Sequence, residues 1–139
     1  MVENLNVNDL PLPPALLTAV GDGRWPAAVP ADRLRAVFDD DPVFPRLHPL
    51  EAIVSLNRVW RSESDRAYLG TPSAASPPGD IDPRRSLLIG ELGPDQLIAL
   101  DYRTSATDPA VVYLGPEMRS PWRQVAASFA ELMDRLEVR

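Results

Sequence analysis

The chain has 139 residues, 45% of them hydrophobic, so a single domain with a sizeable core is expected. It contains no cysteine, which excludes disulfides and thiolate metal sites. The net charge of −6 is divided almost equally between residues 1–60 and 61–139, and without a concentrated basic face the chain is not expected to bind nucleic acid. No stretch approaches the ~20 apolar residues of a membrane span, and the N-terminus lacks the basic start of a signal peptide, so we expect a soluble, cytoplasmic protein without membrane contact.

The N-terminal region begins without a clear pattern. Residues 1–9 are polar and are expected to be flexible, which leaves residues 10–139 as the single domain. At 11–23, prolines lead into an apolar run that two glycines follow. This arrangement predicts a short helix with Pro14 in its first turn, because a proline there loses no hydrogen bond.

Two amphipathic segments and a long loop follow. Apolar residues repeat at helical spacing over residues 31–38, which predicts a second helix. A third helix is predicted at 48–62, although Leu56 and Val59 fall outside its main apolar stripe. Prolines and glycines then break any regular pattern over residues 70–83, and a loop of this length inside a compact domain is either mobile or functional.

Three β-strands are predicted after the loop, over residues 86–92, 96–102 and 109–114. The connections are short, and the first is a turn at Gly93-Pro94-Asp95, so the strands should form an antiparallel meander. Alternation places Ile98 and Leu100 on the core face. Asp101 would then point the other way, toward solvent or a partner.

The C-terminal segment is predicted to be an amphipathic helix, with Ser120 as its N-cap and Pro121 in the first helical position. Its apolar stripe consists of residues at helical spacing: Val125, Phe129, Leu132, Met133 and Leu136. Together these elements predict an α+β fold, in which an antiparallel meander sheet packs against helices and the chain ends with this helix.

One ordered set of residues is distributed along the predicted elements. It consists of Leu12-Pro13, Gly93, Asp95, Leu97 to Asp101, Val111 to Tyr113, Trp122, Ser128-Phe129, Leu132 and Leu136. This ordered set resembles the SUKH superfamily, which includes the yeast Smi–Knr cell-wall regulators and many bacterial immunity proteins. The resemblance is clearest over residues 86–139 and looser over 10–85. In the looser part, the glycine-rich stretch that often follows the first helix is reduced to Gly21-Asp22-Gly23.

The resemblance implies an α+β fold and a non-catalytic role. Bacterial members of the superfamily are similar to proteins that bind and neutralise a cognate toxin of a polymorphic or contact-dependent system, often a nuclease or a deaminase. A regulatory scaffold of the Smi–Knr type, with no toxin partner, is the alternative that the same resemblance implies.

Groups suited to catalysis or metal binding are sparse. His48 is the only histidine and precedes Pro49, where a loop or helix cap is the expected role; a small hydrolase using His48 with aspartates is the enzymatic alternative. The Asp-Pro pairs favour turns, and the acids lack the spacing of a calcium loop. We therefore expect no enzymatic activity, no metal and no cofactor.

A protein-binding surface is favoured instead. Acidic residues attract a basic partner, and a strand end beside a long loop is a natural contact surface. The residues expected to contact a protein partner are Asp39, Asp40, Asp41, Asp80, Asp82, Asp101, Tyr102 and Arg103.

Overall fold

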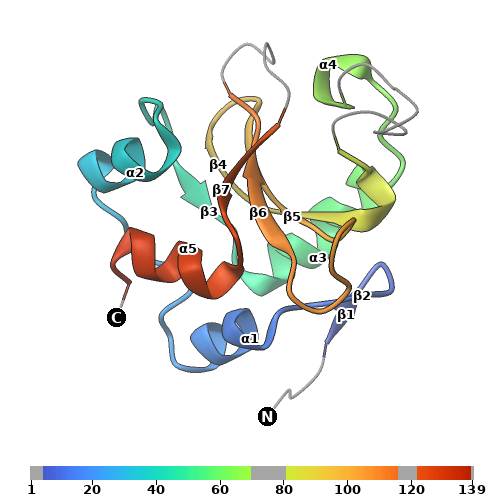
Figure 1. Cartoon of the computed structure of the whole chain (residues 1–139), viewed down its shortest axis with the longest axis horizontal. Coiled ribbons are helices and arrows are strands. Elements are labelled where there is room, and N and C mark those ends of the chain that lie inside the picture. Colours follow the sequence, from blue (N-terminus) through green and yellow to red (C-terminus); the bar gives the residue numbers. More distant parts are fainter. Residues whose placement is uncertain (1–4, 70–80, 116–121, 139) are drawn as a thin grey trace.

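Within the residues that the computed structural model describes (5–69, 81–115 and 122–138), five strands form one antiparallel sheet whose spatial order follows the chain (Figure 1). They are β3 (Arg46–Leu47), β4 (Ser86–Gly93), β5 (Gln96–Asp101), β6 (Ala110–Tyr113) and β7 (Arg123–Ala126). The three predicted strands correspond to β4, β5 and β6, so the predicted meander is confirmed. The sequence did not predict β3 and β7, which add one short strand at each edge of the sheet.

In the same described residues, five α-helices accompany the sheet: α1 (Pro14–Gly21), α2 (Ala31–Phe38), α3 (Leu50–Trp60), α4 (Arg66–Leu69) and α5 (Phe129–Leu136). A 3₁₀ helix, η1 (Pro83–Arg85), leads into β4. Figure 1 shows α5 across one face of the sheet with α1 and α2 beside it, while α3 packs against β4. The predicted α+β class is therefore confirmed. Among the described helices, none has the length and apolar character needed to cross a membrane.

The region before residue 10 differs from the prediction. No regular element was expected there, but β1 (Asn6–Val7) pairs with β2 (Leu10–Pro11) in a small antiparallel hairpin. Val7 is only 4% exposed and belongs to the main core. The described part of the N-terminal segment is thus packed against the domain, because Val7 enters that core and Leu5 packs against it.

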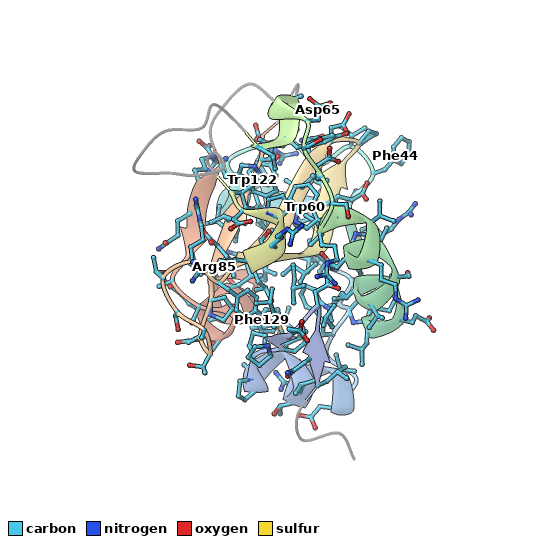
Figure 2. All side chains as sticks on the ribbon, turned by 90° about the vertical axis from the view of Figure 1, so that its right-hand side faces the viewer. Phe44, Trp60, Asp65, Arg85, Trp122 and Phe129 are labelled. Carbon is cyan, nitrogen blue, oxygen red and sulfur yellow. The ribbon has the colours of Figure 1, made fainter. Side chains whose placement is uncertain are left out.

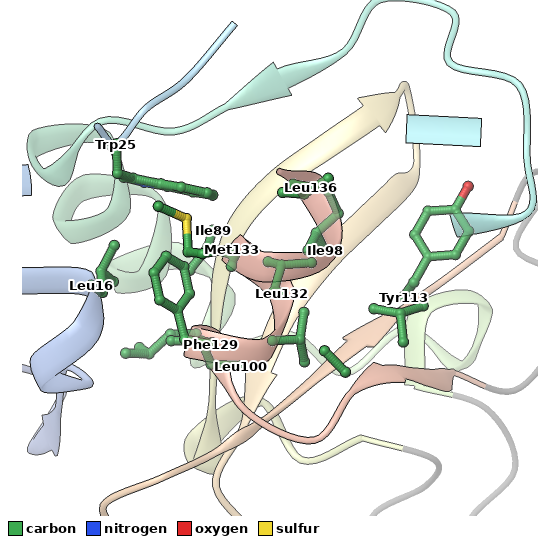
Figure 3. Packing of buried hydrophobic residues seen from close by; sticks show 14 of the residues in the cluster. Leu16, Trp25, Ile89, Ile98, Leu100, Tyr113, Phe129, Leu132, Met133 and Leu136 are labelled. Carbon is green, nitrogen blue, oxygen red and sulfur yellow. The ribbon is translucent and has the colours of Figure 1, made fainter. Parts of the chain in front are cut away.

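The main core lies between the sheet and the helices α1, α2 and α5. α5 points its apolar stripe at the strands, where Phe129 and Leu132 are fully buried (Figure 3). Phe129 also meets Trp25 edge to face, with ring centroids 5.1 Å apart. Burying side chains of this size stabilises a fold by about 1.5–3 kcal/mol each, so α5 is a major contributor to the core.

A second apolar cluster covers the opposite face of the sheet. Its aromatic residues Trp60 and Trp122 have ring centroids 6.1 Å apart, and Figure 2 shows them on the same side of the molecule. The indole N–H of Trp60 donates to Ser86 Oγ, and that of Trp122 donates to the carbonyl of Tyr68. Both faces of the sheet are thus covered, and these buried indoles have hydrogen-bond partners.

The start of the C-terminal helix is a second difference. A helix from Ser120 was predicted, but Arg123–Ala126 is strand β7 and the helix begins at Phe129. Ser120 and Pro121 lie outside the described residues. The true N-cap is Ser128, whose Oγ accepts the N–H of Glu131 at 3.1 Å. The Ser-x-x-Glu pattern of a capping box was present in the sequence at 128–131, but the helical spacing of Val125 to Phe129 concealed it.

Replacing Ser128 with alanine is expected to lower the free energy of unfolding by about 1 kcal/mol, because the N–H of Glu131 loses its partner. Urea denaturation monitored by circular dichroism measures the change. Ser55→Ala, at an exposed site inside α3, is the matched control and should change the free energy by less than about 0.5 kcal/mol. Equal effects of the two substitutions would contradict the assigned cap.

The outer edge of β4 is closed by side chains where β3 ends. β3 pairs with β4 only at Glu91 and Gly90. Farther toward the start of β4, the buried Asn57 of α3 forms the hydrogen bonds that a neighbouring strand would form. Its Oδ1 accepts the N–H of Leu88 at 2.8 Å, and its Nδ2 donates to the carbonyl of Leu88 at 2.9 Å. Asn57 therefore satisfies backbone groups that would otherwise be unpaired at a sheet edge.

Candidate functional site

The residues predicted to contact a partner do not form one surface. The loop that carries Asp39–Asp41 is hydrogen-bonded to Leu92, near the end of β4. Asp101 instead pairs with Ser86 at the start of β4, and a strand of this length spans about 26 Å at ~3.3 Å per residue. Asp80 lies outside the described residues. The structure thus places the predicted contacts at opposite ends of the sheet.

Asp101, Tyr102 and Arg103 form a closed junction. Asp101 does lie on the face opposite Ile98 and Leu100, but it is only 9% exposed, and Arg103 binds both of its carboxylate oxygens, with Nη2 3.0 Å from Oδ2. Tyr102 is 1% exposed and donates its hydroxyl to the carbonyl of Pro11, and burial raises the pKa of its phenol. A partner cannot reach that ring, so the prediction for Tyr102 is corrected.

Asp82 also has a local role. Its carboxylate accepts the N–H of Arg84 at 3.0 Å and caps η1. Asp82, Asp101 and Arg103 are therefore held by contacts within the chain, and Asp101 and Arg103 neutralise each other's charge.

The other end of the sheet carries an exposed loop, residues 39–45, which we call the Phe44 loop. Phe44 is 74% exposed, and Val43 beside it is 58% exposed. Asp39 is exposed, and so is the side chain of Asp41. Figure 2 shows Phe44 projecting from the upper end of the molecule. The loop therefore presents an apolar tip next to acidic side chains.

The Phe44 loop is anchored through its backbone. The N–H groups of Val43 and Phe44 both donate to the carbonyl of Leu92, at 2.8 and 3.2 Å. At the start of the loop, Asp39 ends α2 in the left-handed conformation, with φ of 56°, and its N–H donates to the carbonyl of Arg35. Aspartate tolerates this conformation better than most residues do. A surface that is fixed in this way loses little entropy when a partner binds.

The three aspartates of the loop have different surroundings. Asp40 is half-buried, and its Oδ2 lies 3.7 Å from Nη2 of Arg123. Burial and the nearby Asp40 raise the pKa of Tyr113. Asp41 forms an exposed ion pair with Arg35. Asp40 is therefore a structural anchor, and Asp39 is the acid that forms no ion pair within the described part of the chain.

The turn between β4 and β5 supports the Phe44 loop from one side. A Cβ atom at Gly93 would lie 2.5 Å from Oε1 of Gln96 and 3.1 Å from Cβ of Val43, so a larger residue there would have to displace the Gln96 side chain and crowd Val43. In the same turn, Asp95 accepts the hydroxyl of Tyr68 at 2.7 Å. That hydrogen bond, with a contribution from burial, raises the pKa of Tyr68 to about 12 and ties α4 to the turn.

His48 is buried beside Glu91. It is 5% exposed, and Nε2 lies 3.9 Å from Oε1 of Glu91. Its main chain accepts the indole N–H of Trp25 and donates to the carbonyl of Ile89. Among the described residues, no hydroxyl group is hydrogen-bonded to the imidazole, and nucleophilic catalysis requires such a contact.

The surroundings of His48 predict a pH dependence. Burial, and then the charge of Arg46, lower the pKa of His48 from its ordinary value of 6.5. Below pH 6.5 the unfolded state therefore binds more protons than the folded state, and stability should fall as the pH falls toward the folded-state pKa. His48→Gln should remove this part of the loss. Urea midpoints of both proteins between pH 8 and 5 test it, and parallel curves would contradict it.

The residues described contain no group of three or more acids, histidines or cysteines that could hold a metal ion. The sequence did contain a signal for the Phe44 loop that the prediction missed. Val43 and Phe44 are two large apolar residues between two prolines, directly after three aspartates. A run of this composition lacks the length and periodicity of a buried element.

Comparisons with known proteins do not assign a family or an activity. No protein-family model, no curated protein and no solved structure matches this chain.

Proposed function

We propose that the chain is a non-catalytic protein-binding domain that docks through the Phe44 loop. The observation that carries this proposal is the side chain of Phe44, which is 74% exposed on a loop anchored to β4. A partner that covers a phenylalanine removes a large apolar area from water. Aromatic residues held rigidly at a surface are typical centres of protein interfaces.

The charge around Phe44 indicates the chemistry of the partner. Asp39, Asp41 and Asp95 lie on the loop or on the adjacent turn, and the whole chain carries a net charge of −6. Arg35 offsets Asp41 but leaves Asp39 without a countercharge in the described residues. The partner therefore presents an apolar socket bordered by arginine or lysine, and opposite charges accelerate the association of the two proteins.

The SUKH resemblance supports a more specific form of the proposal. The fold contains helices, an antiparallel meander and a closing helix in the order that the resemblance implies. In this form the chain is a cytoplasmic immunity protein, and its partner is a basic toxin of a polymorphic or contact-dependent system. The Phe44 loop then covers or distorts a functional surface of that toxin.

The test is a binding measurement with proteins encoded next to this gene. A toxin domain among them should bind the chain with 1:1 stoichiometry in isothermal titration calorimetry, and co-expression should rescue growth. Affinity should fall as salt rises from 50 to 500 mM, because charge steers association. Binding by none of the neighbouring products would count against the immunity role, and binding that is unchanged by Phe44→Ala would exclude the proposed site.

A further inference from the structure

The outer face of α3 carries apolar side chains that the fold leaves uncovered. Val59 is 76% exposed and Leu56 is 41% exposed, the former more than any other large apolar residue described. Ala52 precedes them by four and seven residues and is half-buried. Spacings of three, four and seven place these residues on one side of the helix. Leu56 and Val59 are the two residues that fell outside the main apolar stripe of the helix predicted from the sequence.

A groove lies along the other flank of the same exposed helix face. It has a volume of about 610 Å³, and its apolar lining comes from Leu5, Leu50 and Val54. Glu51 and Arg58 line the same groove. The exposed face of α3 therefore has an apolar ridge along one flank and an apolar groove with two charged groups along the other.

The charges on this face are self-complementary. Glu51 and Arg58 are seven residues apart, so they lie within about 20° of each other around the helix and about 10 Å apart along it. Neither forms an ion pair with another described residue. Ser55, a small exposed residue, lies between them. A two-fold axis near Ser55 would bring Glu51 of each copy against Arg58 of the other.

We propose that α3 is a self-association surface, which pairs with α3 of a second copy of this chain in an antiparallel arrangement. In this dimer Val59 packs against Ala52 of the second copy, where the small side chain leaves room. The aliphatic stem of Arg58 enters the groove of the second copy and its guanidinium reaches Glu51 there. Ser55 allows close approach at the crossing point.

A second copy is favoured over an unrelated partner because one helix face supplies both halves of every contact. An unrelated protein would need to reproduce the same order of charges and small residues. The face of one short helix is small compared with a standard interface, so the dimer is expected to be weak, with a dissociation constant of roughly 1–100 μM. It shares no residue with the Phe44 loop and therefore does not depend on the proposed function.

Sedimentation velocity of the purified chain at 1–500 μM tests the proposal. We expect a reversible shift from monomer to dimer. Glu51→Arg and Arg58→Glu should each raise the dissociation constant at least about tenfold, because every dimer contains two copies of the altered pair. The double variant Glu51→Arg/Arg58→Glu restores opposite charges and should dimerise like the wild type. Arg84→Glu, at an exposed site in η1, is the control and should not change the dissociation constant.

The proposal is overturned if the wild type remains monomeric at all concentrations. It is also overturned if the single reversals leave a dimer unchanged, or if the double variant fails to recover. Circular dichroism of each variant checks folding, which exposed substitutions should leave intact. Loss of dimerisation by Val59→Ala, with circular dichroism unchanged, provides a second and independent measure of the same contact.

Discussion

Replacing Asn57 with leucine is expected to lower the free energy of unfolding by about 3–4 kcal/mol. Asn57 is fully buried and forms both hydrogen bonds to the backbone of Leu88, and its Nδ2 also donates to the carbonyl of Ile53 at 2.7 Å. Leucine has a similar size but no polar atoms. The substitution therefore leaves the N–H and carbonyl of Leu88 buried without partners, at a cost of about 1–3 kcal/mol each.

The size of this loss decides whether Asn57 closes the sheet edge. Domains of this size have free energies of unfolding of about 5–15 kcal/mol, so the variant should remain folded with a melting temperature lowered by roughly 10 °C. Ser55→Ala, on the same helix but exposed, is the control and should change the midpoint little. A loss below about 1 kcal/mol for Asn57→Leu would show that water reaches Leu88 and that the edge is open.

Asn57 also illustrates what the sequence could not predict. The apolar pattern predicted the helix at 48–62, but a polar residue on its buried side has no explanation in the local sequence. Asn57 is polar because it binds the backbone of Leu88, 31 residues away in the sequence. That backbone has no strand partner on this side, since β3 is only two residues long. β3 itself lies among prolines and has no alternation, so it forms only because the edge of β4 is available.

Other elements were predicted because their signals are local. The helix at 31–38 has a full apolar stripe and is followed by aspartates and a proline, and the structure has the same bounds. The turn at Gly93-Pro94-Asp95 likewise has the residues that its backbone requires. The helix expected from Ser120 failed because Val125 fits both a helical stripe and the inward face of strand β7.

At the candidate site, too, some features follow from neighbouring residues and others depend on residues far away in the sequence. Acidic residues are visible in a sequence, but whether their charges are free depends on contacts. Asp101 is neutralised by Arg103 two residues away, whereas the burial of Tyr102 depends on Pro11, 91 residues away. Exposure of Phe44 cannot be inferred from its type, because most phenylalanines are buried. The structure therefore separates Asp39–Asp41, beside the end of β4, from Asp82 and Asp101 at its start, and the proposed docking site lies at the end of β4.

Phe44→Ala is expected to weaken binding of the protein partner by about 30- to 1,000-fold, which corresponds to the ~2–4 kcal/mol of an aromatic hot spot. Most of the change should appear as faster dissociation, because the lost apolar contact forms after encounter. Stability should change by less than about 0.5 kcal/mol, since Phe44 is 74% exposed. Surface plasmon resonance with the partner identified among neighbouring gene products measures both rates.

Two further variants test the contribution of charge at this site and the location of the site. Asp39→Asn removes the acid that has no ion pair in the described residues, so it should slow association several-fold at low salt and have little effect at high salt. Val59→Ala is the matched control, because Val59 is 76% exposed but lies on α3. It should leave partner binding within about twofold while weakening self-association. If Val59→Ala weakened the partner as strongly as Phe44→Ala, the docking site would lie on α3, and the Phe44 loop would be exposed for another reason.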